Sequence, residues 1–296
     1  MKLLCATDLT PKSDAAVDRA YQLREAMNTS LALVHVVSPI GADEGTLEQR
    51  LLSASSRLAL RAKHAGGAET ELVVRCGRPS NVVSEEAHTA RLIVMGPHDG
   101  KPLADALHGT FSERLLAEAS CPVLMVRRPG REPYRQMLLA LDGSTHSGHV
   151  VRAAEMLPTA EAGGYAVVHA HEPPYEAMMN TVGVGNVSVA NYASASMSQA
   201  AAAIHAALRL HSLDWRRYRV MLMDARPGPA IREAVRETNP DLLVLGTRGH
   251  GRFRRALLGS TAHEVIDTTD CDVLLVPDAS VRASHRPPDA PGPQAA

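Results

Sequence analysis

The chain has 296 residues, about twice the length of a typical domain, so we expect two domains. Hydrophobic residues make up 45% and charged residues 21%, a balance that excludes disordered, collagen-like and fibrous chains. With 31 Lys and Arg against 32 Asp and Glu, the formal charge of −1 gives no overall field that would draw the chain onto nucleic acid or an anionic membrane.

Short β-branched or leucine-rich runs alternate with longer helical patterns, as in βαβ units that build a parallel sheet. We expect strands near residues 2–8, 31–37, 70–76, 91–96 and 122–127, and again near 136–142, 164–170, 217–223, 241–246 and 273–276. Helices fill the intervals between them. The spacings of Thr46 with Gln49 and of Thr110 with Glu113 predict capping boxes at two helix starts.

The chain contains the same unit twice. Residues 3–8 (LLCATD) are echoed by residues 138–142 (LLALD), an offset of 142 − 8 = 134. Residues 121–126 and 271–276 also match, at an offset of 150, so the second copy carries 150 − 134 = 16 extra residues. We assign the extra residues to 173–188, whose Gly, Asn, Ser and Met content predicts a long loop, and we expect this loop to be a mobile flap.

The repeat sets the expected domain organisation. The first domain spans residues 1–128, a linker follows at 129–134, and the second domain spans 135–278 before a Pro-rich tail, 279–296, that we expect to be disordered. Strands 121–126 and 271–276 are short and apolar, and an unpaired apolar edge invites aggregation. We therefore expect these two edge strands to pair with each other, which would make one chain a pseudo-dimer.

The cysteines and the apolar runs bear on the compartment. Cys5, Cys76, Cys121 and Cys271 are scattered, without the dense framework of secreted disulfide domains, and Cys121 and Cys271 precede strands as small buried residues would. No apolar run is long enough to cross a bilayer, and Asp8 interrupts the N-terminal run too early for a signal peptide. These features predict a cytoplasmic protein with reduced thiols that binds neither nucleic acid nor membrane.

Residues 246–260 are the most informative segment, because they directly follow an expected strand. Small residues at the carboxyl end of a parallel strand let backbone N–H groups approach an anion, and Gly259 and Ser260 open a helix whose N-terminus favours negative charge. Arg248 adds positive charge, and Asp142, at the end of the first strand of the same sheet, can accept ribose hydroxyls. The alternative interpretation is a glycine-rich surface loop with a solvated basic face.

Gly246, Gly249, Gly259 and Ser260 match the motif G-x2-G-x9-G-[S/T] of nucleotide-binding universal stress proteins, and the chain resembles the tandem type of that family (UspA) along nearly its whole length. The resemblance implies an α/β fold of two flavodoxin-like or adenine nucleotide alpha hydrolase-like domains. Each would be a five-stranded, mostly parallel sheet with helices on both faces. It also implies ATP held with Mg²⁺ but without a Walker A loop, and pairing of fifth strands in dimers.

The resemblance assigns roles to residues of the second copy. Asp142 would meet the ribose and adenine side, while Ala170 and Leu245 would line the base pocket. The phosphates would lie among Gly246, Arg248, Gly249, Gly259, Ser260 and Thr261.

The first copy offers a weaker possible second site. Its corresponding positions are Asp8, Val36, Met95, Gly96, Gly109 and Thr110. Asp99 stands where the second glycine belongs, and Pro97 removes an N–H donor. Two like charges about 4 Å apart repel by roughly 4 kcal/mol at an effective dielectric of 20, so we expect a weakened or lost site, or one for a different ligand.

We predict no catalytic residue and no metal site. No nucleophile elbow or zinc-binding helix appears, and no carboxylate or cysteine completes a ligand set around His146 and His149 or around His169 and His171. The expected protein is therefore a nucleotide-responsive regulator of stress survival that binds ATP in its second domain, with unknown protein partners and a further homodimer as options. Two alternatives stay open: a slow ATP-hydrolysing enzyme of the same superfamily, and a nucleotide-free dimeric interaction scaffold.

Overall fold

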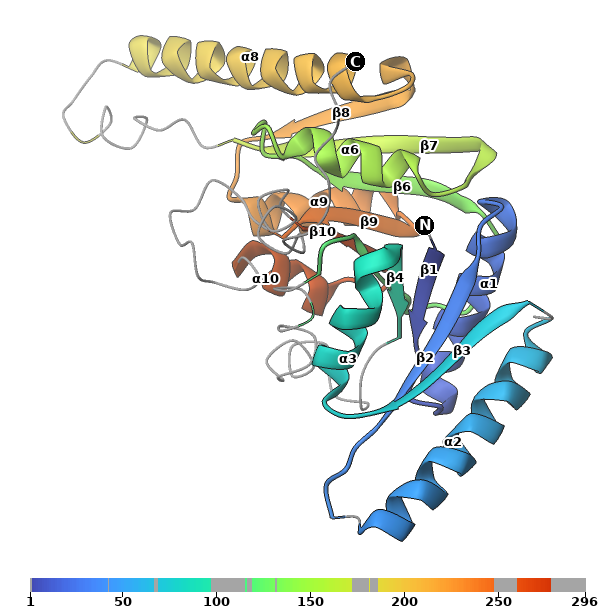
Figure 1. Ribbon diagram of the computed structural model, residues 1–296. Helices are drawn as coiled ribbons and strands as arrows, with labels where there is room; N and C mark the ends of the chain where they lie inside the picture. The colour runs from blue at the N-terminus through green and yellow to red at the C-terminus, as the bar shows by residue number, and fades with distance from the viewer. Residues whose placement is uncertain are drawn as a thin grey trace, which may run out of the picture.

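The computed structural model describes residues 2–41, 43–66, 69–96, 115, 119–130, 132–171, 181, 186–247 and 260–277. Its strands form one ten-stranded sheet through both copies, in the order β3-β2-β1-β4-β5-β10-β9-β6-β7-β8 (Figure 1). The strands are β1 (Lys2–Ala6), β2 (Leu31–Val37), β3 (Thr70–Cys76), β4 (Ala90–Met95), β5 (Val123–Met125), β6 (Tyr134–Ala140), β7 (Thr159–Ala170), β8 (Tyr218–Met223), β9 (Leu242–Gly246) and β10 (Asp272–Val276). The helices are α1 (Asp14–Ala26), α2 (Glu44–His64), α3 (Pro79–Glu86), α6 (Ser147–Glu155), α8 (Asn186–His211), α9 (Pro227–Thr238) and α10 (Ser260–Thr268), with short 3-10 turns η1 (Pro11–Ser13), η2 (Ala87–Thr89) and η3 (Trp215–Arg217).

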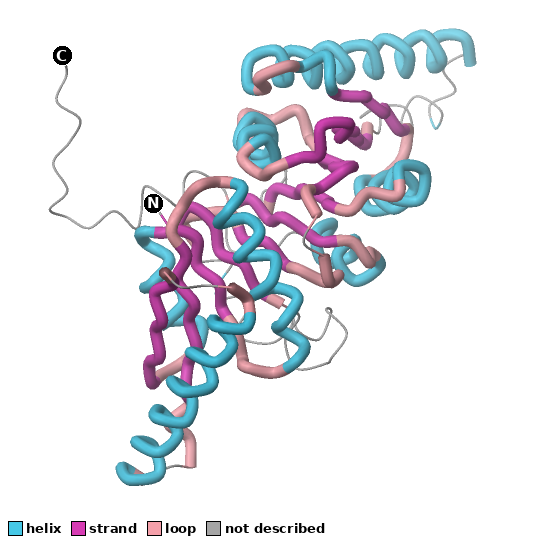
Figure 2. The backbone as a smooth tube through the Cα atoms, turned by 90° about the vertical axis from the view of Figure 1, so that its right-hand side faces the viewer, coloured by secondary structure: helices cyan, strands magenta, loops and turns pink. Residues whose placement is uncertain are grey.

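The sheet separates two layers of helices, each with its own core (Figure 2). Helices α1, α2, α6 and α8 pack on one face, and α3, α9 and α10 pack on the other. Side chains of β9 alternate between the cores, with Leu242 and Val244 on the first face and Leu243 and Leu245 on the second. Each copy contributes five strands that run parallel to one another, so the expected α/β architecture is confirmed.

All ten expected strands are present, and the largest difference is in β7, which starts at Thr159 instead of near residue 164. The expected capping box at Thr46 is wrong. Asp43 is the N-cap of α2, and its Oδ1 accepts a hydrogen bond from the Thr46 backbone N–H at 2.8 Å. Thr46 is therefore the third residue of α2 and donates its backbone N–H to the cap, instead of being the cap itself. Thr110 and Glu113, the other expected capping box, lie outside the described residues.

The expected long loop at 173–188 is partly helical. Helix α8 begins at Asn186 and continues for 26 residues, whereas its counterpart α2 has 21. Part of the extra length of the second copy is therefore a longer helix. The rest of the expected flap lies outside the described residues, apart from residue 181.

Helix α8 is also the longest of the described helices, and it contains no acidic residue. Two leucines near its C-terminal end are largely exposed, Leu210 at 76% and Leu213 at 91%. Even so, none of the helices in the described part of the chain combines the length and the hydropathy that crossing a bilayer requires.

The two copies join through their fifth strands. Strand β5 pairs antiparallel with β10, with Val123 opposite Leu275 and Met125 opposite Val273. The predicted pairing of strands 121–126 and 271–276 is confirmed, and both strands are buried in the middle of the sheet. The open edges are β3 and β8, where Glu71 and Arg219 are exposed, as expected of edge strands that must not aggregate.

A buried carboxylate, Asp272, links segments on both sides of this junction. It is 2% exposed, and it accepts hydrogen bonds from the Arg127 backbone N–H at 2.8 Å and the Tyr134 hydroxyl at 2.8 Å. The Arg19 side chain of α1 approaches Asp272 Oδ2 to 3.7 Å, an ion pair that is too long for a hydrogen bond, and lies over the Tyr134 ring. Burial raises the pKa of Asp272, and these donors oppose that rise by favouring the charged form.

Replacing Tyr134 by Phe removes the hydroxyl that donates to Asp272 and keeps the ring beneath Arg19. We expect the free energy of unfolding in urea to fall by about 1–3 kcal/mol, because a buried charged acceptor loses its partner. The matched control is Tyr21→Phe, whose hydroxyl lies 2.9 Å from the neutral Thr70 Oγ1. An equal or smaller loss in Tyr134→Phe than in the control would show that Asp272 does not depend on this hydroxyl.

The four cysteines differ sharply in exposure. Cys5, Cys121 and Cys271 are buried, as expected for the last two, whereas Cys76 is exposed at the end of the edge strand β3. Burial raises the pKa of the Cys5 and Cys271 thiols to about 12.

We expect one thiol per folded chain, Cys76, to react rapidly with Ellman's reagent at about pH 8, because buried thiols are shielded and stay protonated. All four cysteines should react after unfolding in guanidinium. The variant Cys76→Ser should lose the rapid phase and keep the slow one. Rapid labelling of a second cysteine in that variant would contradict the burial of the other thiols.

Candidate functional site

The site predicted for the second copy lies where the strand order of that copy reverses. The chain passes from β6 outward to β7 and β8 and then returns to β9 on the other side of β6. In open α/β sheets, ligands bind outside the carboxyl ends of the strands at such a switch point. Asp142 follows β6, Ala170 ends β7, and Gly246 ends β9, so the topology brings these three predicted residues to one edge of the sheet.

Ala170 and Leu245 lie on the same face of the sheet, on the two strands that flank β6. Leu245 is buried in the core beneath α9 and α10, and Ala170 is half-buried and packs against that core. Strand register places Ala140 of β6 beside Leu245 on one side and Val168 on the other. The two residues predicted for the base pocket therefore contribute small or aliphatic surface to one face, which suits a planar, weakly polar ring.

Asp142 shapes the loop that follows β6. Its Oδ1 accepts hydrogen bonds from the Ser144 backbone N–H at 2.9 Å, the Ser144 hydroxyl at 2.6 Å and the Ser147 hydroxyl at 3.1 Å. Gly143 adopts a positive φ of 76°, a left-handed conformation that favours glycine. The carboxylate is thus held in a fixed position at the edge of the sheet, half-buried, with its charge stabilised by three donors.

A buried histidine fixes the strand end beside Asp142. His169 Nδ1 lies 2.7 Å from the carbonyl oxygen of Leu141, and since a carbonyl only accepts, Nδ1 carries the proton. The first copy repeats the contact between His35 Nδ1 and the Thr7 carbonyl at 2.9 Å. Sequence analysis considered His169 only as a possible metal ligand. Within the described ranges, no three His, Cys, Asp or Glu side chains gather as a metal site requires.

The phosphate side of the predicted site is described at its two ends. Gly246 is half-buried at the end of β9, and the N–H of the buried Thr247 donates to the Val276 carbonyl at 3.0 Å. Helix α10 begins at Ser260, so Ser260 and Thr261 lie in its first turn, where backbone N–H groups have no partner within the helix. Arg248, Gly249 and Gly259 lie outside the described residues.

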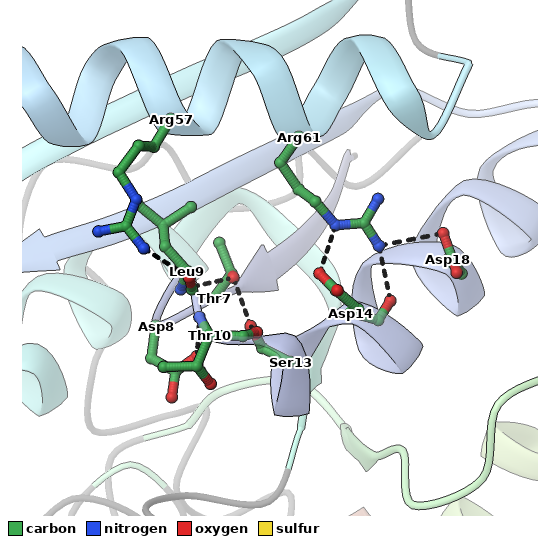
Figure 3. A network of polar contacts seen from close by, with 9 residues as sticks. All are labelled: Thr7, Asp8, Leu9, Thr10, Ser13, Asp14, Asp18, Arg57 and Arg61. Atoms are coloured by element: carbon green, nitrogen blue, oxygen red, sulfur yellow. Dashed lines mark hydrogen bonds and ion pairs between the residues drawn. The ribbon is translucent and has the colours of Figure 1, made fainter.

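The first copy has the equivalent loop after β1, but different hydrogen bonds hold it in place (Figure 3). Asp8 Oδ1 accepts from the Thr10 backbone N–H at 2.9 Å and the Thr10 hydroxyl at 2.8 Å. Leu9, not glycine, adopts the positive φ of 60°. Arg57 of α2 reaches over the loop and donates to the Leu9 carbonyl at 2.7 Å, so a charged side chain covers this corner.

A second arginine of α2 anchors the helix that follows the loop. Arg61 Nε donates to Asp14 Oδ1 at 2.6 Å, and its Nη2 donates to Asp18 Oδ1 at 3.1 Å (Figure 3). Helix α2 therefore holds both the loop and the start of α1 in place. In the same copy Val36 is half-buried, Met95 is buried, and Gly96 is buried against the backbone of the loop.

The closeness of that contact is clear from what a side chain at Gly96 would meet. A Cβ there would lie 3.2 Å from the Lys12 carbonyl oxygen and 3.2 Å from Ser13 Cα, both of which are backbone atoms. Gly109 and Thr110, the remaining residues of the weaker predicted site, lie outside the described residues, as do Pro97 and Asp99.

The second copy has uncharged side chains where the first has this cover. At the offset of 134, Gly143 corresponds to Leu9, and a Cβ on Gly143 would meet Ala203 Cβ and Ile204 Cδ1 of α8, both at 3.9 Å. Where α2 presents Arg57 to the loop, α8 thus presents an alanine and an isoleucine. Sequence analysis missed this difference, although the pairing of Leu9 with Gly143 in the repeat was a signal for it.

Replacing Asp142 by Ala should destabilise the loop, because three donors lose their acceptor, and we expect the free energy of unfolding to fall by about 1–2 kcal/mol. Asp142→Asn keeps a side-chain oxygen that can accept from Ser144 and should cost less. Urea unfolding of both variants tests this order. Equal stability of the Ala variant and the unmodified chain would show that the carboxylate does not organise the loop.

Comparison with known proteins finds relatives that match both copies of the repeat. A family model described as "Universal stress protein family" matches residues 1–127 and again residues 133–277. A universal stress protein of Mycobacterium tuberculosis is 24% identical over 311 residues, covering 92% of this chain and 94% of its own length. One from Thermus aquaticus is 30% identical over 143 residues, 48% of this chain and 98% of that protein. A solved universal stress protein from Archaeoglobus fulgidus superposes with a TM-score of 0.65 at 17% identity, over 93% of this chain and 96% of that one, a likeness of fold.

Proposed function

Since the chain belongs to the universal stress protein family, we propose that its second domain, residues 135–278, binds ATP in the cytosol and signals nucleotide occupancy to protein partners during stress. The observation that carries the proposal is the convergence of Asp142, Ala170, Gly246 and the first turn of α10 at the carboxyl edge of β6, β7 and β9. A carboxylate, an apolar face and a helix N-terminus are the three elements that recognise ribose, base and phosphate.

The described residues fit a nucleotide in polarity and in order along the edge. Asp142 would accept from the ribose hydroxyls, and Ala170 and Leu245 would contact the base. Around the phosphates we place the residues Gly246, Arg248, Gly249, Gly259, Ser260 and Thr261. Mg²⁺ would enter with the nucleotide and neutralise part of the phosphate charge.

We further propose that the first domain binds ATP weakly or not at all. Asp99 and Pro97, which follow β4 in the sequence, would oppose an anion there. The described loop also favours weak binding, because Arg57 holds the Leu9 carbonyl and Gly96 is packed against the backbone of Lys12 and Ser13. One chain would therefore carry one strong nucleotide site, although it contains two copies of the fold.

The direct test is mass spectrometry of the nucleotide released from freshly purified protein, followed by calorimetry with ATP. We expect bound adenine nucleotide and one ATP per chain. Rapid multiple turnover with release of AMP or ADP would favour an enzyme of the same superfamily, and no binding at any concentration would favour a nucleotide-free scaffold. Either result would overturn the proposed function.

The variant Gly249→Asp places in the second copy the carboxylate that the first copy has at Asp99, and it should weaken ATP binding by the second domain. A carboxylate beside the phosphates costs roughly 3–4 kcal/mol, which corresponds to a loss of affinity of about two to three orders of magnitude. The reverse change, Asp99→Gly, is the matched variant and should strengthen binding in the first domain. Calorimetry that finds two equivalent sites in the unmodified chain, or undiminished affinity in Gly249→Asp, would falsify the assignment.

A further inference from the structure

Helix α10 of the second copy is held at its C-terminal end by a residue of the first copy. Arg127 directly follows the last buried residue of the β5 segment, Val126, and its Nη2 donates to the Ile266 carbonyl oxygen at 2.5 Å. Ile266 is one of the last four residues of α10, and the carbonyl oxygens of these four residues have no N–H partner within the helix. A cation there also suits the negative end of the helix dipole.

Arg127 is itself fixed at its backbone. Its N–H donates to Asp272 Oδ1 at 2.8 Å, and the N–H of Arg128 donates to the same oxygen at 3.3 Å. Asp272 is the first residue of β10 and is buried, with Tyr134 and Arg19 as further partners. The guanidinium of Arg127 therefore extends from a rigid base in the sheet to the end of α10.

A second anchor of α10 comes from α9, within the same domain. Glu264 forms an ion pair with Arg232 of α9 and packs so tightly on Gly228 that a Cβ there would lie 2.2 Å from Glu264 Oε2. Ala262, Val265 and Ile266 bury the inner side of the helix. Arg127 holds the C-terminal end of α10 and Glu264 holds its middle, so neither of these two contacts involves the first turn at Ser260 and Thr261.

The support runs in one direction. At the offset of 150, the position of Asp272 is Pro122 in the first copy, and the position of Arg127 is Pro277 in the second copy. Proline has neither the carboxylate nor the guanidinium, so the second copy cannot return this contact. Among the described contacts, the Arg127 support therefore reaches the helix of the copy that keeps the full glycine motif.

We propose that Arg127 is a positioning residue for the phosphate side of the nucleotide site, an inference that rests on the proposed function. Helix α10 has nine residues and behaves as a short rigid rod, so the direction of its first-turn N–H groups follows from where its C-terminal end is held. Arg127 sets that end. The base and ribose side, at Asp142, Ala170 and Leu245, lies on β7, β9 and the loop after β6, so it does not use the first-turn N–H groups of α10.

The test compares ATP with adenosine in the full chain by calorimetry. Arg127→Met keeps most of the side-chain volume and removes the donor, so ATP affinity should fall by about tenfold while adenosine affinity stays unchanged. Arg128→Met is the matched control, because the described contact of Arg128 to Asp272 uses its backbone N–H, and it should leave both affinities unchanged. Hydrogen exchange without nucleotide should rise in α10 of Arg127→Met and not in α9.

Equal losses for ATP and adenosine in Arg127→Met, or no loss for either, would overturn the inference and leave the proposed function standing. If Arg127→Met does not fold, Arg127→Lys keeps the charge and the backbone contact and should show a smaller fall in the ATP to adenosine ratio. An unchanged ratio in Arg127→Lys would then overturn the inference. A wild-type chain that binds adenosine but no ATP overturns the proposed function, and the inference with it.

Discussion

The antiparallel hydrogen bonds between β5 and β10 are the constraint on which the architecture depends. Each strand is short and, apart from Asp272 at the start of β10, apolar on both faces, so neither half could leave such an edge in water without risk of aggregation. Pairing them continues both cores across the junction, so Leu124 and Leu274 share one core while Val123 and Val273 share the other. The same pairing brings Arg127 of the first copy against the last helix of the second.

The central strands β4, β5, β9 and β10 were predictable because nearly all their residues are buried on both faces, which gives continuous aliphatic runs that stand out from the helical pattern. The first residue of α2 could not be predicted, because Asp43 and Thr46 both suit an N-cap and the sequence alone does not choose between them. The Asp272 cluster was hidden for a different reason. Its partners Arg19, Arg127 and Tyr134 are spread over three segments, and only the folded sheet brings them to one carboxylate.

For the candidate site, Asp142 and Gly246 could be placed from the sequence because strand ends fall at the switch point of the topology. The contact of Arg57 with the first-copy loop could not be predicted from the sequence, because it depends on which side chains of α2 face Leu9. Arg57 contacts the loop and Arg61, one helical turn away, contacts α1, whereas Ala203 and Ile204 face Gly143 in the second copy. Such a difference comes from helix rotation and packing, not from a local motif.

The one-sided contacts of Asp272 bear on why a tandem chain differs from a pair of identical subunits. In a symmetric dimer every interface residue occurs twice, so a buried carboxylate two residues from the central Leu124–Leu274 pair would have to be accommodated at both ends of the paired strands. Joining the two units in one polypeptide lifts that restriction, because Pro122 and Asp272 can occupy equivalent places without being equal. Covalent linkage thus lets natural selection change one half without the other, so that the second copy carries a buried carboxylate that the first copy lacks.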